Sequence, residues 1–169
     1  SSGGHSQFGA KLRTLQFNSS FRKTVKRVVI VTDCDEDPTH SFDAVCQQIQ
    51  SAGYPVPHAP YEPAEAGGMK LAVAMIPRDT PGNLECYLAD AAKAPRPEIA
   101  AHVDHFMNMT AIGADWTDPK KGKLWLRAFV AARWPRDPCI NIAPMFADAN
   151  ARSIVPTNHS SFDPMVTFL

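Results

Sequence analysis

The sequence predicts an α/β fold in which a parallel sheet is flanked by helices and followed by a mostly helical C-terminal part. Two apolar runs carry this prediction, because residues 26–32 (KRVVIVT) and 71–76 (LAVAMI) have the continuous hydrophobicity of strands buried on both faces. A helical spacing of apolar residues follows each run, at residues 38–53 and 82–93. Strand, loop and helix in this repeated order are typical of parallel strands joined by crossover helices.

The remaining elements are expected to be helical. Apolar residues recur at helical spacing over residues 6–17 and 99–107, and residues 123–134 are apolar almost all round, which is typical of a buried helix. A length of 169 residues suits one domain. We therefore expect a single domain, with an α/β core over residues 3–95 and a mostly helical part over residues 96–169.

Charge and hydropathy exclude several classes of protein. Lys and Arg number 17 and balance 17 Asp and Glu, so bulk charge does not indicate a strongly basic nucleic-acid-binding protein. The longest apolar run, residues 71–76, is far too short to span a bilayer. No charged segment followed by an apolar one opens the chain, so a signal peptide is not predicted and no membrane partner is expected.

The chain has four cysteines without the short spacing of a metal or redox motif: Cys34, Cys46, Cys86 and Cys139. They lie within or beside apolar stretches, which is typical of buried free thiols. Free thiols persist in a reducing compartment, so we expect a cytoplasmic protein.

Four acidic residues directly follow the first predicted strand, in the segment VVIVTDCDEDP: Asp33, Asp35, Glu36 and Asp37. Ligands of open parallel sheets bind at the carboxyl ends of the strands, and carboxylates crowded there repel one another unless a cation neutralises them. Asp33 and Asp35 are two residues apart, so an extended backbone projects both side chains to one side. A hard cation, Mg²⁺ or Mn²⁺, fits these oxygen ligands. The alternative is a solvated acidic turn in which an Asp caps the next helix.

The same segment resembles the DxD strand and loop of the Toprim fold, which topoisomerases, primases and OLD-type nucleases share. Further motifs follow in the order found in Toprim-like domains of an uncharacterised prokaryotic family related to OLD-type nucleases: Gly53-Tyr54-Pro55, Met75-Ile76-Pro77, Pro81-Gly82-Asn83-Leu84-Glu85, and Lys123 at the start of an apolar helix. Each motif is weak alone, but the ordered set covers most of the chain and is more specific. The resemblance implies a Toprim-like (Rossmann-like) fold.

The resemblance also implies roles for particular residues. Asp33 and Asp35 would be metal ligands, and Glu85 would complete the shell around Mg²⁺ or Mn²⁺. Lys123 would lie near the scissile phosphate and stabilise charge that develops in the transition state. Two simpler interpretations stay open, in which Glu85 favours a helix N-terminus and Lys123 is a solvated lysine. The implied function is a metal-dependent phosphodiester hydrolase, a Toprim-type nuclease that acts on nucleic acid.

One departure from the Toprim pattern bears on this function. The pattern needs a Glu at the end of an earlier strand, and this sequence has no Glu before Glu36. Gly3-Gly4 resembles a glycine-rich turn of the family, so the Glu-bearing strand lies upstream of Ser1 or is absent. If it is absent, we expect a catalytically silent Toprim-like module that binds a protein partner, such as an ATPase by analogy with OLD-type relatives.

Two other interpretations are weaker. The segment DCDED resembles the motif of dehalogenase-type phosphatases, in which Asp33 would attack a phosphoryl group, but that motif normally has Thr or Val where this chain has Asp37. His102 and His105 lie three residues apart on one predicted helical face and begin a zinc-site pattern, yet the sequence offers no assignable third ligand.

Overall fold

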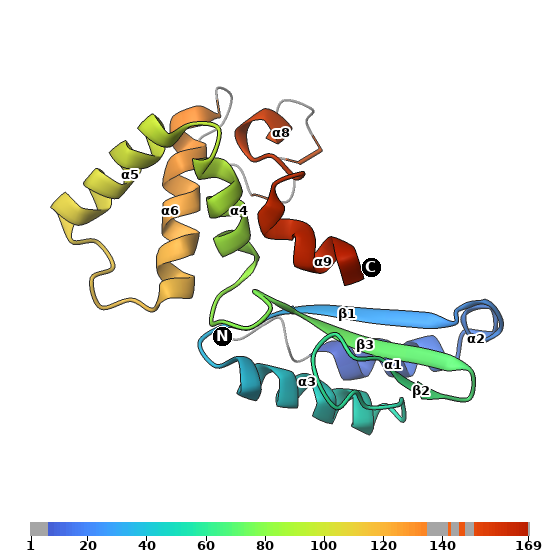
Figure 1. The fold of residues 1–169 in the computed structure, drawn as a ribbon. Helices are drawn as coiled ribbons and strands as arrows, with labels where there is room; N and C mark the ends of the chain where they lie inside the picture. The colour runs from blue at the N-terminus through green and yellow to red at the C-terminus, as the bar shows by residue number, and fades with distance from the viewer. Residues whose placement is uncertain (1–6, 135–141, 143–145, 148–150, 169) are drawn as a thin grey trace. The chain divides into compact units, whose positions relative to one another are not determined.

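The computed structural model describes these stretches of the chain: residues 7–134, 142, 146–147 and 151–168. The chain divides into two compact units, Ser1–Pro81 and Gly82–Leu169. The α/β class is confirmed, because the first unit contains a three-stranded sheet flanked by helices (Figure 1). The boundary between the units lies at Pro81, whereas the sequence placed the change to the helical part at residue 95.

The sheet of the first unit is mixed. Its strands are β1 (Arg27–Asp33), β2 (Ala64–Ala66) and β3 (Met69–Ile76), in the order β1-β3-β2. β1 and β3 are parallel, as predicted. β2 runs antiparallel to β3, so the expectation of a wholly parallel sheet is wrong.

A short hairpin explains this error. β2 has only three residues, Ala-Glu-Ala, and is too short to show the alternation of a strand. Gly67 and Gly68 have φ angles of +59° and +75°, which other residues rarely adopt, and they form the two-residue turn between β2 and β3. The Gly-Gly pair ahead of an apolar run was therefore the hairpin signal in the sequence.

β1 is an edge strand among the described residues, where it pairs with β3. Its continuous hydrophobicity predicted a central strand, so that prediction is wrong. Ile30 is 6% exposed and faces the core, whereas Val31 on the opposite face is 42% exposed. A continuous β-branched run did not distinguish a strand with one buried face from a strand with two.

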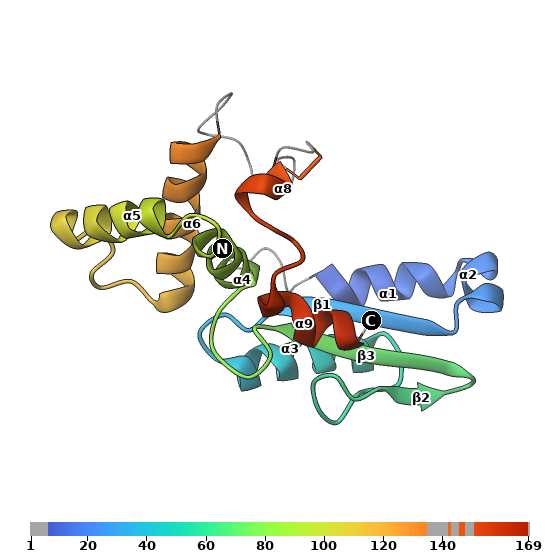
Figure 2. The same ribbon diagram turned by 45° about the horizontal axis from the view of Figure 1, so that its top comes forward.

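Helices α1 (Phe8–Gln16) and α3 (Pro38–Ser51) cover one face of this sheet (Figures 1 and 2). They approach closely at Gly9, whose N–H donates to the Gln48 side chain at 3.2 Å and whose Cβ, if present, would lie 3.3 Å from the Gln48 carbonyl oxygen. Helix α2 (Ser19–Thr24), which precedes β1, was not predicted. Apolar residues of α1, α3, β1 and β3 form the core: Leu12, Ile30, Val45, Ile49, Leu71, Val73 and Met75.

The second unit is helical in its described residues. Its longer helices are α4 (Leu84–Lys93), α5 (Pro97–Thr110) and α6 (Asp118–Arg133). Shorter elements follow towards the C-terminus: α8 (Ala151–Ile154), the 3-10 turn η2 (Ser160–Phe162) and α9 (Asp163–Phe168). None of the helices in the described stretches is long and apolar enough to cross a membrane.

Two details of the helical unit differ from the prediction. Val103 and Phe106 were both expected on the apolar stripe of α5, and Val103 is buried there, whereas Phe106 is 47% exposed. α6 begins at Asp118 and not at Lys123, where the sequence placed its start. Pro119 is compatible with the first turn of a helix, because the N–H that proline lacks would have no partner within the helix there. The core of this unit contains Trp125 stacked on Phe129, with ring centroids 5.1 Å apart.

Candidate functional site at the strand ends

The carboxyl ends of β1 and β3 lie side by side and bring two loops of the first unit together. Asp33, the last residue of β1, pairs in register with Ile76, the last residue of β3. Beyond the strands, the Cys34 N–H donates to the Ile76 carbonyl at 2.8 Å, and the Cys34 thiol donates to the Pro77 carbonyl at 2.7 Å. The loops after the two strands therefore start next to each other, as expected for parallel neighbours.

The acidic loop after β1 turns sharply at Asp35. The φ angle of +50° places Asp35 in the left-handed region, which Asp adopts more readily than most residues. The Ser41 hydroxyl donates to the Cys34 carbonyl at 2.8 Å and so fastens the loop to α3. Asp33 and Asp35 are half-buried on either side of the buried Cys34. The backbone is extended up to Asp33 but not at Asp35, so strand geometry does not project both side chains to one side as expected.

The other acidic residues of this loop have different places. Asp37 is the N-cap of α3, where its carboxylate accepts from the His40 N–H at 3.0 Å. For Asp37 the simpler interpretation as a helix cap is thus correct, and the cap accounts for an Asp where a dehalogenase-type motif has Thr or Val. Glu36 is exposed.

Cys34 lies among carboxylates. Burial, and after it the negative charges of Asp33, Asp35 and Asp79, raise the pKa of the Cys34 thiol to about 12. The thiol is therefore protonated near neutral pH and is neither a nucleophile nor a ligand for a hard cation. Because the charge of Asp79 acts on the Cys34 thiol, the loop after β3 contributes a third carboxylate near this edge of the sheet. Asp79 was not among the predicted site residues, although the rule that identified Asp33 applies equally to the end of the next strand.

A cation accompanies Asp79 in the loop after β3. The Arg78 Nε lies 3.8 Å from an Asp79 carboxylate oxygen, and the guanidinium carbon lies 4.9 Å from the centroid of the Tyr61 ring. Tyr61 is fastened to β3, because its N–H donates to the Val73 carbonyl at 2.8 Å and its hydroxyl donates to the Met75 carbonyl. Neither Arg78 nor Tyr61 was predicted as a site residue, because the loop that carries Tyr61 has no motif and contacts β3 only in the folded chain.

The available donors decide which metal sites fit. In the described part of the chain, no three His, Cys, Asp or Glu side chains form a group that could hold a metal ion. An all-protein cage, such as a zinc site at His102 and His105, therefore does not fit these residues. Mg²⁺ needs fewer protein ligands, because one or two carboxylates, several waters and a substrate phosphate usually hold it. Asp33 and Asp35 fit that smaller donor set.

The remaining predicted site residues, Glu85 and Lys123, belong to the second unit. Glu85 is in the first turn of α4, after the N-cap Asn83, where a carboxylate favours the positive end of the helix dipole. It also lines a mostly apolar pocket of about 530 Å³ together with Arg127. Lys123 is exposed in the second turn of α6. The predicted ligand set is therefore divided between the units, with its two Asp residues together in the first.

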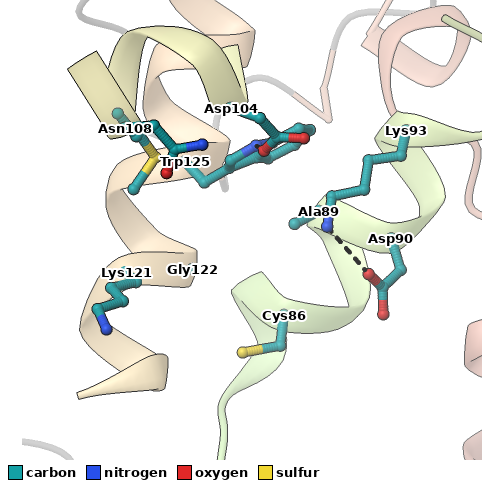
Figure 3. A pocket seen from close by; sticks show the side chains of 10 residues that line it. Cys86, Ala89, Asp90, Lys93, Asp104, Asn108, Lys121, Gly122 and Trp125 are labelled. Atoms are coloured by element: carbon teal, nitrogen blue, oxygen red, sulfur yellow. Dashed lines mark hydrogen bonds and ion pairs between the residues drawn. The ribbon is translucent and has the colours of Figure 1, made fainter. Parts of the chain in front are cut away.

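A second pocket of the helical unit, of about 510 Å³, is walled by α4, α5 and α6 (Figure 3). The Trp125 indole N–H donates to the Asp104 carboxylate at 2.6 Å. The Lys93 Nζ lies 4.9 Å from the Trp125 ring centroid and 3.6 Å from an Asp90 oxygen, the contact dashed in Figure 3. The bond between Asp104 and Trp125 joins α5 to α6, and the contact of Lys93 with Trp125 joins α4 to α6, so these charged side chains have structural partners in the pocket.

The described cysteines are not joined by disulfide bonds. Cys34, Cys46 and Cys86 are free thiols as predicted, but of these three only Cys34 is buried as expected, and Cys46 and Cys86 are partly exposed. Cys139 and the pair Gly3-Gly4 lie outside the described residues.

The chain matches the model of the DUF3226 family, described as a protein of unknown function, over residues 1–169. No curated protein and no solved structure matches the chain. Because the family match extends over the full sequence given, this protein belongs to the DUF3226 family.

Proposed function

We propose that this protein is a Toprim-like, metal-dependent phosphodiester hydrolase that acts on nucleic acid and uses Mg²⁺ or Mn²⁺. The observation that carries the proposal is the pair Asp33 and Asp35 at the carboxyl end of β1, beside the carboxyl end of its parallel neighbour β3. The strand β1, the helix α3 and the parallel strand β3, in that order along the chain, support the Toprim-like part of the proposal.

The roles of the residues follow from this arrangement. Asp33 and Asp35 bind the ion through hard carboxylate oxygens. The bound ion supplies a Lewis acid for the scissile phosphate and lowers the pKa of a water molecule. The left-handed turn at Asp35 and the hydrogen bond from Ser41 to the Cys34 carbonyl fix the backbone that carries both residues at the strand end. Cys34 stays protonated and adds no further negative charge there.

Cleavage of labelled DNA and RNA in Mg²⁺ and in Mn²⁺ tests this proposal. The wild-type protein is expected to cleave at least one substrate only with metal present, and Asp33→Ala and Asp35→Asn are expected to lose cleavage. Asp43→Asn is the matched control, because it removes an exposed carboxylate of α3 and leaves the strand end intact. Wild-type cleavage by Asp33→Ala, or no cleavage of any substrate by the wild type, would contradict the proposal.

Glu85 and Lys123 remain predictions within the same proposal. If Glu85 completes the metal shell, Glu85→Gln weakens Mn²⁺ binding measured by titration calorimetry. If Lys123 acts near the scissile phosphate, Lys123→Ala lowers the cleavage rate and leaves Mn²⁺ affinity unchanged. Wild-type values for both variants would limit the site to residues of the first unit.

A catalytically silent Toprim-like module that binds a protein partner, such as an ATPase, is the second candidate. It is favoured by the balance of 17 Lys and Arg against 17 Asp and Glu, which gives the chain no excess positive charge for binding nucleic acid. A wild-type protein that binds Mn²⁺ through Asp33 and Asp35 but cleaves neither DNA nor RNA would support this candidate over the hydrolase.

A further inference from the structure

Arg78 is joined to the candidate site by the backbone itself. It follows Pro77, whose carbonyl accepts from the Cys34 thiol at 2.7 Å. It precedes Asp79, whose charge acts on the same thiol. Because Cys34 lies between Asp33 and Asp35 in the chain, the loop that carries Arg78 starts beside the two proposed metal ligands.

The Arg78 side chain is restrained by Tyr61. The guanidinium lies over the Tyr61 ring, 4.9 Å from its centroid. Tyr61 has a φ angle of +66°, which is unusual for a bulky residue, and its hydrogen bonds to the carbonyls of Val73 and Met75 hold it there. Stacking uses the face of a guanidinium, whereas a phosphate is bound by the N–H donors on its edge, so the two interactions are compatible.

The ion pair between Arg78 and Asp79 is exposed to solvent. The side chains of Arg78 and Asp79 are 53% and 81% exposed, and the contact is 3.8 Å. An ion pair that exposed contributes little to stability. A lysine would also serve such a pair, whereas the planar guanidinium is suited both to an aromatic face and to a phosphate.

We propose that Arg78, held over Tyr61, binds a phosphate of the nucleic-acid backbone beside Asp33 and Asp35. The inference rests on the proposed function, and it assigns to the first unit a phosphate-binding cation that the sequence resemblance assigned to Lys123. A cationic side chain at this edge adds to the metal ion in offsetting the repulsion between the carboxylates and a phosphate. A guanidinium does so with paired, charge-assisted hydrogen bonds.

Fluorescence anisotropy with a labelled single-stranded oligodeoxynucleotide, in Ca²⁺ and in EDTA, tests this role. Arg78→Ala should weaken binding about tenfold, since it removes hydrogen bonds to a charged group. It should also reduce the slope of log affinity against log salt by about 0.7, the share of one single-strand phosphate contact. Arg78→Lys should keep the wild-type slope and bind more weakly, because it retains the charge without the planar fork.

Arg27→Ala is the matched control for the loss of charge. Arg27 is exposed at the amino end of β1, about 20 Å from Asp33 at the rise of a strand, and its variant should bind as the wild type does. Tyr61→Leu removes the ring under the guanidinium and should behave like Arg78→Lys. The exposed position of Arg78 lets Arg78→Ala decide the matter even if Tyr61→Leu does not fold.

Wild-type affinity and salt slope for Arg78→Ala would overturn the inference. If cleavage still depends on Asp33 in that case, the proposed function stands without this role for Arg78. If binding depends on Arg78 but the wild type neither binds Mn²⁺ nor cleaves, the inference stands and the hydrolase proposal fails. A wild-type protein that binds no single-stranded DNA, duplex DNA or RNA at low salt would overturn both.

Discussion

Replacing Asn83 by alanine should destabilise the helical unit by roughly 2–4 kcal/mol. Asn83 is fully buried at the N-cap of α4, where its Oδ1 accepts from the Cys86 N–H at 3.3 Å. Its Nδ2 donates to the carbonyl of the buried Pro119, at the start of α6, at 3.1 Å. Loss of an N-cap costs about 1 kcal/mol. A buried carbonyl left without its donor adds about 1–3 kcal/mol.

Urea unfolding monitored by tryptophan fluorescence measures this loss, because all three tryptophans of the chain lie in the second unit. Asn83→Ser keeps an acceptor for the cap but not the donor to Pro119, and it should lose an intermediate amount of stability. The control is Asn18→Ala, because Asn18 caps α2 by accepting from the Phe21 N–H at 3.0 Å at an exposed position.

Asn18→Ala should cost about 1 kcal/mol or less, measured by circular dichroism. Equal losses for Asn83→Ala and Asn18→Ala would refute the reasoning that the buried bond between α4 and α6 adds to the cap. So would an Asn83→Ser variant that is no more stable than Asn83→Ala.

Two further predictions concern cysteines. The pKa of Cys34 is raised from 9.0 to about 12 in the folded protein, so its contribution to stability is complete below pH 9.0 and is lost as the pH rises towards 12. The unfolding free energy in urea should therefore fall over that range by less in Cys34→Ala than in the wild type, and equal falls would contradict the shift. A Cβ on Gly122 would lie 3.1 Å from the Cys86 sulfur, so Gly122→Ala should gain little of the roughly 1 kcal/mol that Ala offers over Gly in a helix. In a Cys86→Ala background the same change should gain most of it, whereas equal gains in both backgrounds would count against the contact.

The strands and helices that carry the site were predictable because their signals are local. The apolar runs of β1 and β3 and the helical stripe of α3 each lie within one stretch of sequence. The sheet order was not predictable in the same way, because it depends on a three-residue strand and on pairing between distant segments.

The candidate site was predictable in part for a related reason. The spacing of Asp33 and Asp35 after a strand is a local signal, and the same rule applied to β3 would have found Asp79. The stacking of Arg78 on Tyr61 depends on a loop that meets β3 only in the folded chain, so no local pattern announces it.

The motif Pro-Gly-Asn-Leu-Glu, which ends at Glu85, has a structural role at the start of α4. The sequence predicts from this motif a helix start that carries a metal ligand, Glu85. In the structure, Gly82 has a φ angle of +152° and Asn83 caps α4 from a buried position. Both residues serve the backbone, which shows that a motif of this kind also marks how a helix begins.

The most direct test of the account is thermal unfolding in EDTA and in millimolar Mn²⁺. A cation that binds only the native state adds about 2.7 kcal/mol at a hundred times its dissociation constant, so Mn²⁺ should raise the melting temperature of the wild type. Asp35→Asn removes one carboxylate, and Asn adopts the left-handed conformation of this position as Asp does. This variant should lose most of the metal-dependent shift, yet without metal it should melt no lower than the wild type, because repulsion between carboxylates is relieved. A wild-type melting temperature that is the same in EDTA and in Mn²⁺ would contradict a metal site at Asp33 and Asp35.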